Sequence, residues 1–288
     1  MRPADEVFAT ERARLLGLAY RILSSYADAE DVVQEAWIRW QGVEAHAVER
    51  PAAYLTTVVT RLALDRARTI ARRREHYLGP WLPEPVAVEC GPEVHAEMAE
   101  SLTLGFLLVL DRLAPTERAV WLLAEVFGEP YALIASAVGK SEAACRQIAA
   151  RARRRLREER PPPPERLDPD LLRKLLAAVA AGDLASTLEL LDADAVLVSD
   201  GGPDHRAARH PVVGAERVAR LAINLARRGE VTALREATIN GAAALVVELD
   251  GGMPLVLTGE QQGGRITRVY LLLNADKLGG ISARPAIT

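Results

Sequence analysis

Four consecutive prolines at positions 161–164 divide this 288-residue chain into two parts with different hydrophobic patterns. A proline run forms a stiff extended spacer and cannot continue a helix. Before it, apolar residues recur at intervals of three and four, as in helices. After it, short apolar runs are punctuated by glycine and aspartate, as in strands joined by hairpins. The pattern predicts helical domains followed by an α+β domain.

The net charge of −3 conceals two basic segments. Residues 61–75 hold six arginines against two acids, and residues 143–157 hold six arginines and no acid. Between them, residues 76–105 contain five glutamates and no lysine or arginine. Two basic clusters on either side of an acidic connector indicate a protein with two surfaces for nucleic acid.

The first part predicts three helices between Phe8 and Glu75. Asp28 is expected to cap the second helix, Gly42 to end it, and Pro51 to begin the third. The connector that follows is rich in proline and glycine, yet its Trp81 and Leu82 are too apolar to remain in solvent, so we expect them to pack on a neighbouring surface. Further helices are predicted at about 97–113, 115–127, 130–138 and 142–158.

The last two of these helices have the pattern of a helix-turn-helix. Gly139 permits the turn, and Ser141 can cap the second helix through its hydroxyl group. The inward stripe of that helix is expected to be Cys145, Ala149, Ala152 and Leu156. Its outward positions are Arg146, Gln147, Ala150, Arg151 and Arg154. Arginine and glutamine can form paired hydrogen bonds with base edges, and arginine also suits phosphates.

After the prolines, a helix is predicted at 171–183 and another at 215–228. Strands are expected at 195–199, 243–249, 253–259 and 265–273, with hairpins at the paired glycines. The segment DGGPDHRAARHP contains Asp200, His205 and His210, which are candidates for acid–base chemistry. Its glycines, prolines and charges favour a surface loop, and we expect no catalytic residue there.

Several classes of protein are disfavoured. Cys90 and Cys145 are far apart and indicate neither a disulfide framework nor a zinc site. No apolar run is long enough to cross a membrane and the N-terminus has no signal-peptide core, so a cytoplasmic location without membrane binding is expected. No nucleotide loop or metal cluster is evident, and the expectation is no cofactor and no metal.

Two segments closely resemble the extracytoplasmic-function sigma factors. Residues 14–40, RLLGLAYRILSSYADAEDVVQEAWIRW, resemble the core-polymerase-binding helices of that family, above all in DAEDVVQEA at 28–36. Residues 110–157 resemble its second, promoter-binding domain. The resemblance implies a transcription initiation factor whose partners are core RNA polymerase, through the beta-prime clamp helices, and promoter DNA.

The resemblance also implies roles for individual residues. The implied polymerase-binding face is Asp31, Gln34, Glu35 and Ile38. The helix at 51–74 would expose Thr56, Thr57, Thr60 and Arg61 and, with Arg68 and Arg72, read the −10 element. The −35 element would be read by Ser141, Arg146, Gln147, Ala150, Arg151 and Arg154.

Three shorter motifs resemble one branch of the family, whose members carry a SnoaL-like C-terminal domain. They are WLPEP at 81–85, DGG at 200–202 and NADKL at 274–278, where Ala275 replaces the proline of that branch. The implied fold is two all-α helical sigma domains plus a C-terminal α+β SnoaL-like cone-shaped barrel domain. Its implied interdomain regulatory residues are Trp81, Leu82, Pro83, Asp200, Asn274, Asp276 and Lys277. The resemblance leaves open whether the pit of this domain binds an unidentified small-molecule ligand.

The expected organisation is a polymerase- and −10-binding domain at 5–75, a linker at 76–105, a −35-binding domain at 106–160, a proline-rich spacer at 161–166 and a SnoaL-like regulatory domain at 167–288. Two alternatives remain. A polymerase-independent DNA-binding regulator would keep the helix-turn-helix but lack DAEDVVQEA. A small-molecule enzyme, isomerase- or cyclase-like, would need a polar pit in the C-terminal domain.

Overall fold

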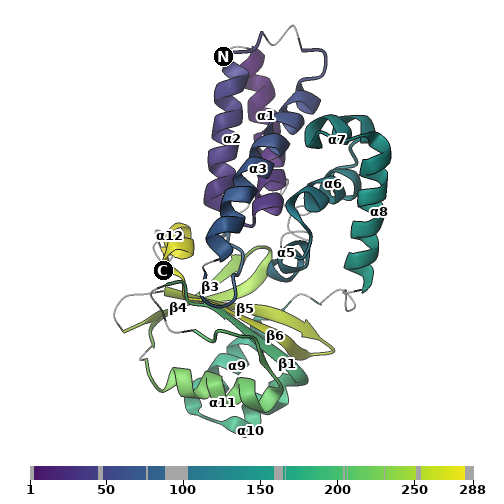
Figure 1. Ribbon diagram of the computed structural model, residues 1–288. Helices are drawn as coiled ribbons and strands as arrows, with labels where there is room; N and C mark the ends of the chain where they lie inside the picture. Colours follow the sequence, from purple (N-terminus) through teal and green to yellow (C-terminus); the bar gives the residue numbers. More distant parts are fainter. Residues whose placement is uncertain are drawn as a thin grey trace. The chain divides into compact units, whose positions relative to one another are not determined.

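The computed structural model divides the chain into two compact units. The helical unit comprises residues 1–75 and 106–160, and the sheet unit comprises residues 76–105 and 161–288. The connector before the helix-turn-helix region therefore belongs with the C-terminal part of the chain (Figure 1). The structure describes residues 3–44, 48–75, 77–87, 103–158, 165, 167–203, 205, 207–229, 231–250 and 254–282. Cys90, the start of the helix expected at 97–113 and nearly all of the proline spacer lie outside these ranges.

The first three helices of the helical unit pack against one another. They are α1 (Pro3–Leu23), α2 (Tyr26–Gln41) and α3 (Pro51–Glu75). The N-cap of α2 is Ser25, whose hydroxyl oxygen accepts a hydrogen bond from the backbone N–H of Asp28 at 3.3 Å. The expectation that Asp28 caps this helix was wrong by one turn, because a serine three residues earlier already satisfies the free N–H groups. Gly42 ends α2 as predicted.

The remaining helices of this unit include the predicted helix-turn-helix. They are α6 (Pro115–Glu125), α7 (Tyr131–Val138) and α8 (Glu142–Glu158), and α5 (Leu104–Leu110) precedes them. Gly139 adopts the left-handed conformation, with φ of 68°, between α7 and α8. The Ser141 oxygen accepts from the N–H of Ala144 at 3.2 Å. Both features confirm the predicted helix-turn-helix.

The sheet unit is built on a six-stranded sheet in the order β2-β1-β6-β5-β4-β3 (Figure 1). The strands are β1 (Leu191–Asp200), β2 (Val212–Val213), β3 (Val231–Ile239), β4 (Ala242–Leu249), β5 (Pro254–Gln262) and β6 (Arg265–Leu272). Neighbours are antiparallel except β1 and β6, which are parallel. Gly263 and Gly264, both with positive φ, form the predicted turn between β5 and β6.

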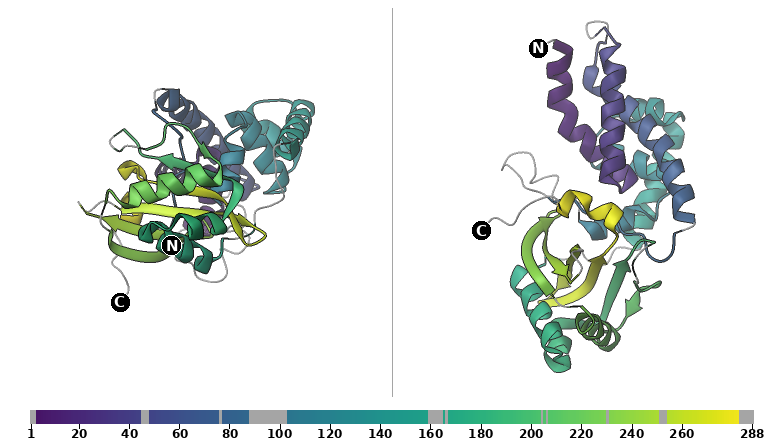
Figure 2. Two further views of the ribbon diagram at one scale, coloured as in Figure 1. Left: turned by 90° about the horizontal axis from the view of Figure 1, so that it is seen from below. Right: turned by 90° about the vertical axis from the view of Figure 1, so that its left-hand side faces the viewer.

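Helices cover one face of this curved sheet (Figure 2). They are α9 (Pro169–Ala181), α10 (Leu184–Leu190) and α11 (Ala215–Ala226). Their apolar faces bury a continuous core with the strands, including Leu175, Val218, Leu245 and Val269. A last helix, α12 (Ala275–Ser282), follows β6 and contacts β5.

Three elements and one strand pairing of this unit differ from expectation. β3 was missed because it is an edge strand that carries Arg235 and Glu236 and is largely exposed, so it lacks an apolar run. Two further elements were not expected: β2, which has two residues, and the short helix α10. The parallel pairing of β1 with β6 was also unforeseen, because hairpin signals report only local connections. The α+β class was nevertheless predicted correctly.

Candidate polymerase and DNA interfaces and the linker contact

The predicted polymerase-binding residues form one exposed face of α2. Asp31, Gln34 and Glu35 are exposed, and Ile38 is 63% exposed. Asp31 forms an ion pair with Arg66 of α3, and Glu35 Oε1 accepts from Arg39 Nη2 at 2.7 Å. Such solvent-exposed pairs contribute little stability and exchange partners readily. The exposed face of α2 thus carries one apolar side chain, Ile38, beside two carboxylates.

The α3 face differs from the expectation. Thr56 and Thr60 are fully buried rather than exposed, since α3 contacts α1 and α2 as well as α6 and α7. The hydroxyl oxygen of Thr56 accepts from Arg14 Nη2 at 2.6 Å, and Thr60 donates to the Thr56 carbonyl at 2.7 Å. Their hydroxyl groups are thus engaged inside the protein.

The other four predicted −10 residues lie outside that buried stripe. Thr57 is half-buried, and Arg61, Arg68 and Arg72 are exposed. Arg68 forms an ion pair with Asp65, and Arg61 Nη2 donates to the Ser136 carbonyl of α7 at 2.7 Å. The structure therefore keeps an arginine-rich face on α3.

The predicted −35 residues lie together on α8. Arg146, Gln147, Ala150, Arg151 and Arg154 are all exposed, while Cys145, Ala149, Ala152 and Leu156 are buried, as the periodicity predicted. Arg146 forms an ion pair with Glu142 at 2.7 Å and stacks over Tyr131 at 5.2 Å from the ring centroid. The hydroxyl group of Ser141 acts as a helix cap. Burial raises the pKa of the Cys145 thiol.

The linker is bound to the sheet unit around one buried ion pair. Lys277 Nζ donates to Asp200 Oδ2 at 2.7 Å and to the Leu82 carbonyl at 2.6 Å. The Leu82 N–H donates in turn to Asp200 Oδ2 at 2.8 Å. Leu82 is fully buried, and Asp200 is 1% exposed. Asp200 was expected on a surface loop, but the linker covers it.

Aromatic rings complete this contact. Lys277 Nζ lies 3.5 Å from the ring centroid of Trp81 and 5.4 Å from that of Tyr77. The Tyr77 hydroxyl donates to Asp200 Oδ1, and Asn274 Nδ2 donates to the Tyr77 oxygen at 2.9 Å. Burial and the adjacent Asp200 carboxylate raise the pKa of Tyr77. A desolvated ammonium group against two rings is strongly attracted to them.

The linker contact extends to the edge of the sheet. Pro83 is buried, the Val86 N–H donates to Asn240 Oδ1 at 3.0 Å, and Ala87 pairs antiparallel with Ile239. Asp276 is exposed at the start of α12, where its N–H donates to Asn274 Oδ1 at 3.1 Å. This hydrogen bond, from the backbone of Asp276, helps to orient the Asn274 side chain.

Sequence reasoning assigned no role to Tyr77 and noted Gly202 only as part of the DGG motif. Tyr77 stands four residues before Trp81 in an aromatic-rich segment, which was the available signal. Gly202 has a φ of +65°, and a Cβ there would come within 2.8 Å of the Asn274 side chain. Glycine is therefore required for Asn274 to approach.

Comparison with known proteins identifies the family of the helical unit. Residues 7–74 match the Sigma-70 region 2 family, and residues 104–156 match Sigma-70 region 4. The chain is 36% identical to the ECF RNA polymerase sigma factor SigJ of Mycobacterium tuberculosis, over 95% of this chain and 92% of that protein. It is 30% identical to the probable ECF RNA polymerase sigma factor SigI of the same species, over 98% and 97% of the two chains.

This chain belongs to the extracytoplasmic-function sigma factor family. The crystal structure of the Mycobacterium tuberculosis SigJ sigma factor superposes on it with a TM-score of 0.75 and 32% identity, covering 96% of this chain and 98% of that one. The similarity thus includes the sheet unit. As a sigma factor, the protein binds core RNA polymerase and directs it to promoters, which confirms the predicted function. In the part of the sigma factor that the structure describes, no helix combines the length and apolarity needed to span a bilayer.

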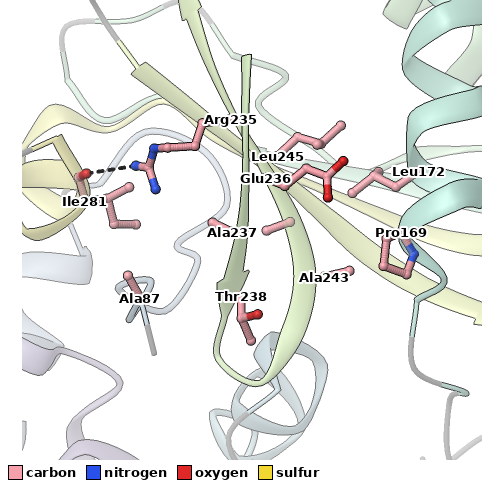
Figure 3. Close-up of a pocket in the computed structure, with 11 residues that line it drawn as sticks. Ala87, Pro169, Leu172, Arg235, Glu236, Ala237, Thr238, Ala243, Leu245 and Ile281 are labelled. Atoms are coloured by element: carbon pink, nitrogen blue, oxygen red, sulfur yellow. Dashed lines mark hydrogen bonds between the residues drawn. The ribbon is translucent and has the colours of Figure 1, made fainter. Parts of the chain in front are cut away.

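The sheet unit of this sigma factor contains a cavity of about 360 Å³ beside β3 and β4 (Figure 3). Arg235 points toward α12, and its Nη2 donates to the Ile281 carbonyl at 3.2 Å. Glu236 forms an ion pair with Arg173 at 2.7 Å. The remaining lining is mostly alanine, leucine and proline. Its described lining does not include Asp200, His205 or His210, the earlier acid–base candidates.

Proposed function

We propose that the sheet unit is a built-in regulator, which controls promoter engagement by holding the linker between the two DNA-binding domains. The observation that carries this proposal is the buried Asp200–Lys277 pair, which binds both backbone groups of Leu82. A linker held in this way cannot adopt another path while the contact persists. The sheet unit thereby restricts the spacing available to the domains at either end of the linker.

The contact is suited to release. Asp200 and Lys277 both belong to the sheet unit, so their ion pair does not depend on the linker for its existence. Around this pair the linker contributes two backbone hydrogen bonds of Leu82, the buried Leu82 side chain, the Tyr77 hydroxyl group and two aromatic rings. Because these interactions form one small cluster, a partner that competes for the linker can disrupt them together. We assign that partner as core RNA polymerase.

The polymerase surface itself is the exposed face of α2. Asp31, Glu35 and Gln34 surround the exposed Ile38, and this arrangement suits a basic partner with an apolar contact at its centre. We assign the beta-prime clamp helices as that partner. The exposed arginines of α3 and α8 would then contact the −10 and −35 elements, with Arg146 and Gln147 at base edges and Arg154 at phosphates.

The cavity beside β3 supports a ligand-binding role better than a catalytic one. Its volume lies in the range of small-molecule sites, and its lining is mainly apolar. Each of its two charged side chains, Arg235 and Glu236, already has a partner. Ala87 of the linker also lines it, so a bound small molecule would touch the regulated segment directly.

The test is run-off transcription with core polymerase and a cognate promoter. Lys277→Met keeps a side chain of similar length and removes the ammonium group, so the linker should be released and transcriptional output should change severalfold. Lys174→Met, on the exposed surface of α9, removes the same charge and should leave output unchanged. Truncation after Pro164 should reproduce the Lys277→Met effect. Identical output from all four proteins would refute the regulatory role.

A further inference from the structure

Helix α11 of the sheet unit carries a third arginine-rich surface of this chain. Residues 207–228, which include α11, hold five arginines against one acid, Glu216. This excess is local, because residues 161–288 as a whole hold 14 lysines and arginines against 16 acidic residues. The positive charge is therefore concentrated on one element of a domain that is otherwise slightly acidic.

The charges form one stripe on the side of α11 that faces away from the sheet (Figure 2). Its exposed members, three or four residues apart, are Arg217, Arg220, Asn224 and, in the turn after the helix, Arg228. The buried residues of the helix are Val218, Ala219 and Ile223. At 3.6 residues per turn the two sets lie on opposite sides. Glu216 lies at the margin of the stripe and pairs with Arg220 at 2.8 Å.

The stability of the helix does not account for this stripe. Arg217 is in the first turn of α11, where the helix dipole favours acidic residues and disfavours cations. Like charges three or four residues apart also repel each other. In the part of the chain that the structure describes, Arg217 and Arg228 form no ion pair. The arrangement therefore indicates an anionic partner outside the chain.

The chemistry of the stripe suits the phosphate backbone of duplex DNA. Guanidinium groups match phosphate oxygens with paired hydrogen bonds, and an asparagine amide also donates to them. From Arg217 to Asn224 the stripe rises about 10 Å along the helix axis. Each DNA strand presents a phosphate about every 3.4 Å of its axis, so successive side chains can reach separate phosphates.

An acidic protein surface is a poorer match for the stripe. The centre of a protein interface usually holds a large apolar or aromatic anchor. Here the centre holds Arg220 and Asn224, and the exposed Leu225 lies to one side of them. A polar, cationic centre is typical of contacts to DNA phosphates.

We propose that α11 is a third DNA-binding surface of this sigma factor, which contacts the phosphate backbone of duplex DNA without reading its sequence. Arg217, Arg220 and Arg228 contact phosphates, and the Asn224 amide donates to a phosphate oxygen between them. The sheet unit thus acts directly on DNA in addition to binding the linker. The inference does not depend on the proposed release of the linker, since Asp200 and Lys277 take no part in the stripe.

The salt dependence of DNA binding by the full-length protein tests the proposal. Arg217→Gln combined with Arg228→Gln removes two charges of the stripe. The matched control, Lys174→Gln combined with Arg265→Gln, removes two charges from exposed positions of α9 and β6. Affinity for a random-sequence duplex is measured across salt concentrations. We expect the stripe variant to bind severalfold more weakly at low salt, with a salt slope lower by about two, and the control to match the parent.

A photo-crosslinker then identifies the molecule that touches α11 in the complex with core polymerase and promoter DNA. It is attached at Asn224→Cys, or at Glu248→Cys on β4 as the control, in a Cys90→Ser background, because Cys145 is buried. We expect DNA to be labelled from Asn224→Cys and not from the control. An unchanged salt slope would overturn the proposal. Labelling of a polymerase subunit in place of DNA would also overturn it and would assign α11 to a protein partner. Either result leaves the linker contact and the sigma function as they stand.

Discussion

Two aspartates, the partly buried Asp111 in the helical unit and the buried Asp200 in the sheet unit, each hold together segments far apart in the sequence. Asp111 pairs with Arg118 of its own domain and with Arg74 of α3. Asp200 pairs with Lys277 and accepts from Leu82 and Tyr77 of the linker. At each site the ion pair lies within one domain, and the same aspartate also accepts hydrogen bonds from a second segment, which lies outside that domain.

The sites differ in what the second segment contributes. At Asp111 it contributes charged and hydroxyl side chains, Arg74 and Ser24, and the pair retains some solvent access, with Asp111 12% exposed. At Asp200 it contributes backbone groups and aromatic rings, and the Asp200 side chain is fully buried. A fully buried charge is held only if its hydrogen bonds are complete. The linker contact should therefore be the more sensitive of the two to a single change.

The largest loss of stability, measured as the free energy of unfolding of the sheet unit, is expected from Asp200→Ala. It leaves the Lys277 ammonium group buried beside Trp81 without its carboxylate, and loss of one partner of a buried pair costs about 3–5 kcal/mol. Urea unfolding of the sheet unit, followed by tryptophan fluorescence, measures this change. Asp194→Ala, at an exposed position of the same strand, is the control and should stay within about 0.5 kcal/mol of the parent. The double variant Asp200→Asn with Lys277→Met should recover much of the loss, and no recovery would contradict the account.

A smaller loss of stability, in the helical unit, is expected from Asp111→Asn. The amide retains part of the hydrogen bonding, and Arg118 keeps its bond to the Ile22 carbonyl. The change removes charge assistance from hydrogen bonds that are each worth about 1.5–3 kcal/mol, so we expect about 2 kcal/mol for the helical unit. Thermal unfolding monitored by helical circular dichroism measures it. A loss as large as that of Asp200→Ala would break the distinction between the two sites.

These two sites also show how far the sequence leads. Asp200, Asn274 and Lys277 lie in short motifs that resemble a known branch, so they were singled out before the structure was known. The Asp111 site has no such motif, because Ser24, Arg74 and Arg118 come together only when two helical domains pack. The exposure expected of Thr56 and Thr60 was wrong, because several helices cover α3 and the sequence of that helix does not show this. In the sheet, β3 was missed because an exposed edge strand needs no apolar run.

Glu260 sharpens the comparison, since it is a largely buried carboxylate whose cation, Arg268, lies farther from it than Lys277 lies from Asp200. Tyr270 donates to its Oε1 at 2.8 Å, and the nearest guanidinium, that of Arg268, lies 3.5 Å from Oε2. Its carboxylate also lies against Gly105, where an added Cβ would fall 1.6 Å from Oε1. Burial raises the pKa of Glu260, while the Tyr270 hydrogen bond and Arg268 oppose that rise.

The smallest predicted effect is the pH dependence that this carboxyl group creates. Above the ordinary glutamate pKa of 4.5 and below the raised value, the folded protein keeps a proton that the unfolded chain has released. The unfolded state therefore binds fewer protons, and the free energy of unfolding falls as pH rises through that window. Glu260→Gln keeps the hydrogen bond to Tyr270 without titrating, so its stability should decline less over the same range. Urea midpoints of both proteins across the window give the two slopes. Equal slopes would show that burial does not raise the pKa of Glu260, and that the more distant Arg268 compensates the carboxylate as fully as Lys277 compensates Asp200.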